Sequence, residues 1–307
     1  MISIIGSGRV GSAIAFLCAH YALDDIVLVN RNGKKAKGVA LDISNAIPGE
    51  STISISGSDD FSQISGSEIV VITASVRTHL QSRAELMYDQ AVMLRDISKN
   101  LVKYSPDAKI LVVTNPVDVL TYLLQKDGFA PKNVIGVASS LDSSRFRYFL
   151  AKEFATDQSK ITDAIVMGEH DDSMVPVFSQ AKFEGKPVDV LLDEQRKLAI
   201  TNNVRNYWRY FREYGVHSVF GIAKNTFDII SSISKNQSFT VPVSVLLDGQ
   251  YRLSDVCIGV PAELTGAGVT KIPQVVLNDI EFNAFTNSAR IVRQNIENVL
   301  AFLKKSN

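Results

Sequence analysis

Residues 1–16 read MISIIGSGRVGSAIAF, and three features follow one another in this stretch. The apolar run at 2–5 is typical of a buried strand, and residues 9–22 have the apolar spacing of an amphipathic helix. The segment GSGRVG, at 6–11, joins the two directly. A strand that passes through a glycine-rich turn into a helix is typical of the beginning of a βαβ unit.

The glycines of this turn have the spacing G-x-G-x-x-G. In that context Gly6 makes the tight turn, Gly8 lets a pyrophosphate approach the backbone, and Gly11 lets the helix pack closely on the strand. A helix N-terminus favours phosphate because its N–H groups are unpaired and the dipole is positive there. The pattern predicts a dinucleotide-binding turn, and a glycine turn that serves only packing is the alternative.

Strand and helix patterns alternate through the first half of the chain. Near-continuous apolar strands separated by amphipathic helices are typical of a parallel sheet covered on both faces. The sequence therefore predicts an α/β fold with a doubly wound parallel sheet, the Rossmann arrangement, over residues 1–140. The further strand candidates are 26–29, 52–55, 68–73, 109–114 and 133–137, and the helix candidates are 9–22, 35–46, 84–104 and 117–126.

Residues 141–307 are less regular and predict a C-terminal α+β domain. A helix at 140–154 has Ser140 or Asp142 as its expected N-cap. A hairpin is expected at 244–261, with Asp248-Gly249 at its turn. The other expected elements are a strand at 163–168, helices around 193–214 and 218–235, and a terminal helix from about 279.

Composition argues against several classes of protein. The chain has 307 residues, 46% of them hydrophobic, with 32 basic and 32 acidic side chains. Such a chain can bury a large core, and zero net charge offers no basic face to nucleic acid. No segment has the composition of a signal peptide or a membrane span. Cys18 and Cys257 lie far apart among apolar neighbours, so we expect buried reduced thiols, no metal cluster and a soluble cytoplasmic protein.

The strand at 26–29 ends in Asn30-Arg31-Asn32-Gly33. In doubly wound folds an acid at this tip accepts hydrogen bonds from the adenosine ribose and repels a 2′-phosphate. Asn30 is neutral, and Arg31 offers a planar cation suited to phosphate. The sequence thus predicts that NADP is accepted, alone or alongside NAD. The alternative is that Arg31 is an ordinary surface charge and NAD binds without the carboxylate.

Polar side chains are expected at the carboxyl edge of the sheet, where ligands bind in such folds. Asn115 follows the strand at 109–114, although an ordinary turn before Pro116 would also use it. Asp142 and Arg145 are three residues apart at a helix start and share one face. An arginine can grip a carboxylate and an aspartate can orient an imidazole, although a local salt bridge is the simpler interpretation.

His170 follows the apolar run at 163–168 and lies among Glu169, Asp171 and Asp172. Neighbouring carboxylates raise the pKa of an imidazolium and so favour a proton-carrying role near neutral pH. A structural histidine is the alternative.

The segment ASVRTHLQSRAEL, at 74–86, carries Arg77 and Arg83. It is polar and is followed by a helix, as expected of a loop that closes over a site and binds an anionic substrate. A solvated loop is the alternative.

Together these motifs resemble the lactate and malate dehydrogenase superfamily, and the details are most similar to its archaeal malate dehydrogenases. The resemblance covers essentially the whole chain, through GSGRVGS at 6–12, NPVDV at 115–119, LDSSRF at 141–146 and GEHDDSMVP at 168–176. It implies an NAD(P)-dependent oxidoreductase in which residues 1–140 bind the cofactor and residues 141–307 form the catalytic and substrate domain.

The resemblance also implies a role for each candidate residue. His170 would be the acid/base that takes the substrate hydroxyl proton, and Asp142 would hold it in the right tautomer. Arg145 would bind the C1 carboxylate, Arg83 would polarise the carbonyl group, and Asn115 would contact the substrate and the nicotinamide ribose.

Substrate choice rests on Arg77 in this comparison. An arginine at the corresponding family position pairs the second carboxylate of malate and oxaloacetate, where lactate and pyruvate have a methyl group. A buried arginine left unpaired by the wrong substrate gives strong discrimination. We therefore expect a malate dehydrogenase with a dicarboxylate substrate. Because the loop is best aligned one residue short of the family pattern, a lactate or other 2-hydroxyacid dehydrogenase is the alternative.

Two further positions bear on the site. Asp171 stands where the family has a glycine, so its charge could raise the pKa of His170 or its side chain could narrow the pocket. Either His217 or Ser218 falls where the family has a small substrate-side residue. A hypothesis of another class is a non-catalytic dinucleotide-binding sensor, which would not need the complete set of residues. The resemblance also implies a homodimer or homotetramer.

Overall fold

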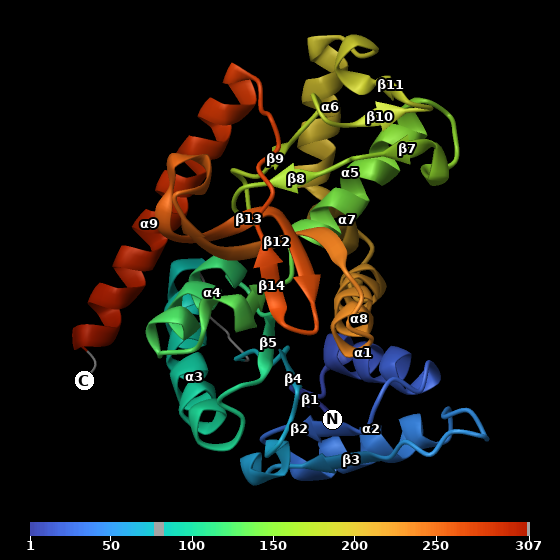
Figure 1. Cartoon of the computed structure of the whole chain (residues 1–307), viewed down its shortest axis with the longest axis vertical. Coiled ribbons are helices and arrows are strands. Elements are labelled where there is room, and N and C mark those ends of the chain that lie inside the picture. Colours follow the sequence, from blue (N-terminus) through green and yellow to red (C-terminus); the bar gives the residue numbers. More distant parts are fainter. Residues whose placement is uncertain (77–82, 306–307) are drawn as a thin grey trace.

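The computed structural model describes residues 1–76 and 83–305 and is built around one nine-stranded sheet (Figure 1). The strand order is β14-β13-β12-β6-β5-β4-β1-β2-β3. Six strands from the first half are parallel: β1 (Ile2–Ile5), β2 (Ile26–Val29), β3 (Ile55–Ser58), β4 (Ile69–Ile72), β5 (Lys109–Val112) and β6 (Val134–Gly136). Their order, 3-2-1-4-5-6, is that of a Rossmann fold, and the predicted fold class is confirmed.

Helices cover both faces of this sheet, as the near-continuous apolar strands require. In Figure 1, α1 lies beside α8, and α3 and α4 lie with α9 on the other side. The helices of the first half are α1 (Arg9–His20), α2 (Gly33–Ser44), α3 (Arg83–Tyr104) and α4 (Val117–Lys126). Those of the C-terminal half that join these two layers are α8 (Phe220–Ser234) and α9 (Asp279–Lys305).

The C-terminal half extends the same sheet with antiparallel strands. These are β12 (Phe239–Asp248), β13 (Ser254–Thr265) and β14 (Gly268–Lys271), and β12 pairs with β6 where Ser244 faces Gly136. The predicted hairpin is therefore present but longer than 244–261. Gly249, at its turn, has a φ of +95°, a conformation that suits glycine.

A second lobe carries its own apolar core. It contains α5 (Ser139–Glu153), α6 (Glu194–Arg205), α7 (Tyr207–Glu213) and a small sheet of β7 (Ile161–Thr162), β10 (Lys182–Phe183) and β11 (Lys186–Pro187). Phe146, Phe149, Leu150 and Val204 are buried in this core. The strands β8 (Val166–Met167) and β9 (Val175–Pro176) pair with each other.

Gly168 fixes the second lobe to the main sheet. It exchanges two backbone hydrogen bonds with Gly259 of β13, of 2.9 and 3.1 Å. Its φ of +93° turns the chain directly after β8, and L side chains rarely adopt such a value. The segment that follows, 169–173, is thereby held at one place against the sheet.

Several predicted boundaries were wrong for identifiable reasons. β3 lies at Ile55–Ser58 and not at 52–55, and the backbone of α2 packs so closely on its Gly57 that no side chain would fit there. A Cβ atom at Gly57 would lie 2.3 Å from the carbonyl oxygen of Ala36. The predicted strand at 163–168 is reduced to β8, and the predicted helix at 193–214 is two helices separated at Asn206.

The expected N-cap of the helix at 140–154 was also wrong. α5 begins at Ser139 after Ala138, and no side chain among the described residues caps it. The Asp142 carboxylate accepts hydrogen bonds from other side chains, as described below, and so is not available to the first turn.

Both cysteines are free and buried, as expected. Burial raises the pKa of the Cys18 thiol to about 12, so this side chain serves as a small core residue. Among residues 1–76 and 83–305, no helix is long and apolar enough to cross a membrane.

Candidate active site

A cavity of about 670 Å³ lies at the carboxyl ends of the parallel strands. It is bordered by the loops after β5, β6 and β8 and by side chains of the second lobe. Ile5, Val29 and Ile72 are the last residues of neighbouring strands and are paired in register, so the segments that follow reach one edge of the sheet together. Asn115, Arg145 and His170, all predicted as site residues, line this cavity.

Asp142 binds two side chains at once, those of His170 and Arg145. Its Oδ2 lies 2.5 Å from Nδ1 of His170, and its Oδ1 accepts a hydrogen bond of 3.0 Å from Nη1 of Arg145. The Asp142 side chain is 1% exposed, so these pairs are shielded from water. An ionised carboxylate only accepts hydrogen bonds, which assigns the hydrogen of this contact to Nδ1. Nε2 is then the ring nitrogen left for the cavity.

The pKa of His170 is raised above its usual value. Burial of the ring lowers the pKa, but the charge and hydrogen bond of Asp142 more than offset this effect. Arg145 lowers the pKa and Asp118 raises it further. The acids next to His170 in the chain were expected to raise this pKa, and the family resemblance pointed to Asp142. The main acid is Asp142, 28 residues away in sequence.

Asp118 is a site residue that the sequence analysis missed. It lies in the first turn of α4, is 4% exposed, and accepts a 2.9 Å hydrogen bond from the backbone N–H of His170 through Oδ2. Burial raises its pKa. The signal that could have revealed it is an acid among the apolar residues of 117–124, since a buried acid needs a partner.

Arg145 lies where a substrate carboxylate could reach it. Its Nη2 is 3.5 Å from Oγ of Ser218, and its guanidinium lies 5.0 Å from the centre of the Tyr207 ring. Its Nε is buried and has no hydrogen-bond partner among the described residues. The side chain is 10% exposed, so a carboxylate bound here would meet a largely desolvated cation.

The structure separates the two candidates at the small-residue position. Ser218 lines the cavity, whereas His217 is exposed and does not appear among the lining residues described. Asp171 also lines the cavity. Arg77 lies outside the described residues, and Arg83 is the first residue of α3 but its side chain is outside the described part.

The glycine turn fits a dinucleotide. Gly6 has a φ of +111°, and a Cβ atom there would lie 2.5 Å from the backbone nitrogen of Ala74. A Cβ at Gly11 would lie 1.9 Å from the carbonyl oxygen of Gly6, whereas none of the described atoms lies within 4 Å of one at Gly8. Oγ of Ser7 is buried without a hydrogen-bond partner among the described residues. A tight turn, an open backbone and an orphaned hydroxyl group suit a phosphate ligand.

The tip of β2 is organised by its asparagines. Oδ1 of Asn30 accepts a 3.0 Å hydrogen bond from the N–H of Asn32, and Asn32 caps α2 through a 3.1 Å bond from the N–H of Lys35. Arg31 is exposed. The carboxylate of Asp59 packs against Gly33, since a Cβ there would lie 2.8 Å from its carboxyl carbon. An acid that the sequence analysis overlooked therefore lies close to this tip.

The described residues contain no evident set of metal ligands. Within 1–76 and 83–305, no three His, Cys, Asp or Glu side chains are grouped so that they could hold a metal ion.

Family models match both halves of the chain. Residues 1–136 match the lactate/malate dehydrogenase NAD binding domain, and residues 139–303 match the lactate/malate dehydrogenase alpha/beta C-terminal domain. The chain therefore belongs to the lactate/malate dehydrogenase family, as expected from its motifs.

Relatives within this family include both kinds of enzyme. A malate dehydrogenase of Staphylococcus saprophyticus is 35% identical, covering 99% of this chain and 98% of that protein. A malate dehydrogenase of the archaeon Archaeoglobus fulgidus is 34% identical, covering 96% and 98%. An L-lactate dehydrogenase of Clostridium acetobutylicum is 35% identical, covering 97% and 98%. The solved malate dehydrogenase of Aeropyrum pernix has a TM-score of 0.92 at 30% identity, covering 97% of each chain.

Proposed function

We propose that this protein is a malate dehydrogenase that interconverts malate and oxaloacetate with a nicotinamide cofactor. The observation that carries the proposal is the Asp142 carboxylate, which binds both Arg145 and His170 beside one cavity. A 2-hydroxy acid needs a cation for its carboxylate and an acid/base for its hydroxyl group. The names of several relatives support this activity.

Substrate binding begins at Arg145. Asp142 and Ser218 hold its guanidinium group, and the C1 carboxylate completes the hydrogen bonding of the cation. Because the arginine is largely removed from water, this pairing is stronger than one on the surface.

His170 moves the proton. In the oxidation direction its neutral Nε2 accepts the hydroxyl proton, and Asp142 stabilises the imidazolium that results. In the reduction direction the same nitrogen returns the proton to the substrate oxygen. The cofactor, when bound, accepts or supplies the hydride at C2 of the substrate.

Three other residues complete the proposed site. Asn115 lines the cavity, and its amide contacts the substrate and the nicotinamide ribose. The family pattern supports Arg83 as the side chain that polarises the carbonyl group. It also supports Arg77 as the partner of the second carboxylate, which makes the substrate a dicarboxylate.

Cofactor binding is assigned to Gly6, Gly8 and Gly11, which would receive the pyrophosphate. Membership of a family with an NAD-binding domain supports NAD. NADP is accepted as well, because Asn30 lacks the charge that would repel a 2′-phosphate and Arg31 adds a cation. Asp59 acts against NADP, since it sets a carboxylate near the same tip.

Residues 1–140 bind the cofactor, and residues 141–307 bind the substrate. The limits of the two family models, at 136 and 139, support this boundary. The protein assembles as a homodimer or homotetramer, a proposal supported by the large apolar side chains that α1, α2 and α8 expose.

Steady-state kinetics with NADH and NADPH, each with oxaloacetate and pyruvate, test the activity. We expect oxaloacetate with NADH to be a good substrate pair, and faster turnover of pyruvate would refute the assignment to malate. His170→Ala should abolish turnover but leave NADH binding intact, because the histidine carries the proton and not the cofactor. Undiminished turnover in that variant would overturn the acid/base assignment.

A lactate dehydrogenase is the second candidate. The observation that favours it is a lactate dehydrogenase relative that is as similar to this chain as the malate enzymes are. The same kinetic constants decide between them. The non-catalytic sensor is disfavoured because Asp142, Arg145 and His170 lie together at one cavity, and failure to oxidise NADH with either keto acid would revive it.

A further inference from the structure

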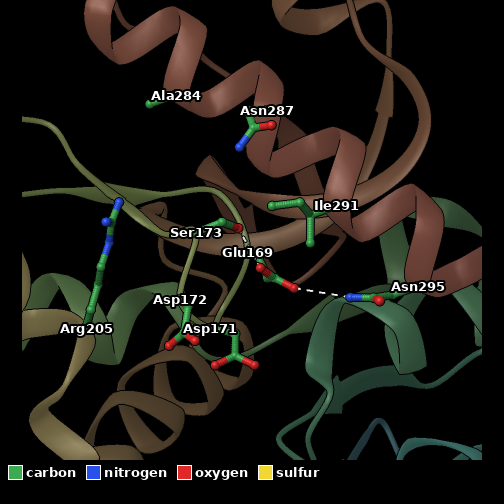
Figure 2. Close-up of a pocket in the computed structure, with 9 residues that line it drawn as sticks. All are labelled: Glu169, Asp171, Asp172, Ser173, Arg205, Ala284, Asn287, Ile291 and Asn295. Carbon is green, nitrogen blue, oxygen red and sulfur yellow. Dashed lines mark hydrogen bonds between the residues drawn. The ribbon is translucent and has the colours of Figure 1, made fainter. Parts of the chain in front are cut away.

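A second cavity, of about 500 Å³, adjoins the proposed active site. Four residues line both cavities and so form the wall between them: Glu169, Asp171, Arg205 and Asn295. Figure 2 shows the second cavity, with the side chains of α9 on one side and those of residues 169–173 on the other. Glu169 belongs to this wall and is the residue directly before His170.

A hydrogen-bond network holds the Glu169 carboxylate against α9. Oε2 accepts a 2.5 Å bond from Oγ of Ser173, and Oε1 accepts a 3.3 Å bond from Nδ2 of Asn295, which is drawn in Figure 2. Ser288, which is fully buried in α9, accepts a 2.8 Å bond from the backbone N–H of Glu169. Its Oγ also lies 2.9 Å from Oγ of Ser173. The carboxylate therefore has a defined position beside the His170 backbone.

Burial and, to a smaller extent, neighbouring acids bring the titration of Glu169 near neutral pH. Burial raises its pKa, the Ser173 hydrogen bond lowers it, and the charges of Asp118, Asp171 and Asp172 raise it again, to about 7. Arg205, from α6, is the cation that shares the wall with it, and α9 contributes the neutral amide of Asn295. Glu169 thus changes charge near neutral pH.

We propose that Glu169 is a positioning residue for the reaction, one whose negative charge raises the proton affinity of His170. The inference rests on the proposed function, because it concerns the histidine assigned there as acid/base. Asp142 acts on the ring through a direct hydrogen bond, whereas Glu169 acts from the neighbouring residue through its field. As Glu169 ionises, the imidazolium becomes more stable and persists to higher pH.

Reduction of oxaloacetate needs protonated His170. The kcat/KM for oxaloacetate therefore falls as the pH rises through the pKa of His170. Glu169→Gln removes the charge but preserves the shape and the ability to accept hydrogen bonds. The alkaline limb of the profile should then move to lower pH by about half a unit or more. Glu169→Asp retains a charge and should stay close to the wild type.

Glu281→Gln provides a matched control. Glu281 lies in α9, the helix that Glu169 contacts, is 6% exposed, and accepts hydrogen bonds of 3.0 and 2.6 Å from the N–H and Oγ of Ser179. The same chemical change there should reduce stability and leave the alkaline limb in place. A purely structural effect of losing a buried carboxylate would appear equally in both variants.

The experiment is the pH dependence of kcat/KM for oxaloacetate with saturating NADH, together with an NMR titration of the His170 ring. We expect both measurements to give a lower histidine pKa in Glu169→Gln. Asn295→Lys leaves Glu169 in place but sets a cation beside it, and it should also lower the pKa of His170. This variant replaces Glu169→Gln if that variant does not fold.

An active wild type with an unchanged His170 pKa in the variant would overturn the Glu169 role alone. A wild type that turns over neither oxaloacetate nor pyruvate would instead overturn the proposed function, and the NMR titration would still test Glu169.

Discussion

At the scale of single residues, the site depends on one carboxylate that binds both a histidine and an arginine. Asp142 binds Nδ1 of His170 with one oxygen and Nη1 of Arg145 with the other. A buried carboxylate is costly unless its oxygens are paired, and this arrangement pairs both. It also fixes His170, the proposed acid/base, and Arg145, the proposed carboxylate-binding residue, relative to each other. We therefore expect proton transfer and substrate position to be coupled through Asp142.

Asp142→Asn tests this coupling. The amide preserves size but removes the charge that raises the pKa of His170. We expect kcat to fall about 100-fold or more, the lower end of what acid/base catalysis contributes. The wild type should lose oxaloacetate reduction and gain malate oxidation as pH rises through the raised histidine pKa. In the variant that crossover should move to lower pH.

Measurement of both reaction directions across the pH range, with NADH binding as a check on folding, gives the answer. A crossover at the same pH in wild type and Asp142→Asn would show that the carboxylate does not control the proton.

The sequence identified the residues of this site better than it identified their partners. His170, Asp142 and Arg145 could be found because their types and spacing carry chemistry in a familiar order. Asp118 was missed. The sequence marks it only as an acid among apolar residues, and its partner, a backbone N–H group 52 residues away, is brought to it only in the folded chain. Ser218 and His217 are neighbours in sequence, and only the path of the chain before α8 decides which one faces the cavity.

At the scale of elements, strand and helix periodicity located the parallel strands but not the close packing between them. The strand at 52–55 was placed too early because β3 has only one large apolar residue, Ile55, and a glycine where α2 packs closely. An apolar-run criterion cannot recognise such a strand. The antiparallel pairing of β12 with β6 was likewise not predicted. It depends on a contact between Gly136 and Ser244, which are 108 positions apart in sequence.

The tips of β2 and β3 lie side by side at the proposed site for the adenosine ribose. Asn30 and Asp59 follow strands that pair in register, with Val29 opposite Ser58. We therefore expect the cofactor preference to depend on both tips. Asn30→Asp should shift the ratio of kcat/KM values toward NADH by about fivefold or more, since a charge near a phosphate changes binding by roughly 1 kcal/mol. Asp59→Asn should shift the ratio toward NADPH.

Kinetic constants for both cofactors in the two variants measure this preference. Lys37→Gln, on the exposed surface of α2, serves as a control for general changes in charge. Equal ratios of kcat/KM for NADH and NADPH in the wild type and both tip variants would mean that neither tip contacts the adenosine ribose.

At the scale of the whole molecule, the site is assembled from both lobes. Asn115 comes from the parallel sheet, Arg145 from α5 and His170 from the segment that Gly168 fixes to β13. α9 lies along the sheet and reaches the same segment through Ser288 and Asn295. A relative movement of the lobes would therefore change the separation of cofactor and substrate groups, so contacts that restrain the lobes also support the site.

One restraint is expected to come from a second copy of the chain. α1 packs against both α2 and α8, and each of these helices exposes large apolar side chains. Phe16, Leu41 and Phe220 are 43%, 71% and 85% exposed. Single exposed apolar residues are common, but several on contacting helices indicate a surface that associates.

We expect gel filtration with light scattering to give the mass of two or four chains. Phe220→Asp should shift the mass toward a single chain, because burying an unpaired carboxylate in an interface is unfavourable. Val190→Asp, at an equally exposed position before α6, should leave the mass unchanged. A wild-type mass of one chain would contradict the assembly, and a Phe220→Asp mass equal to that of the wild type would place the interface elsewhere.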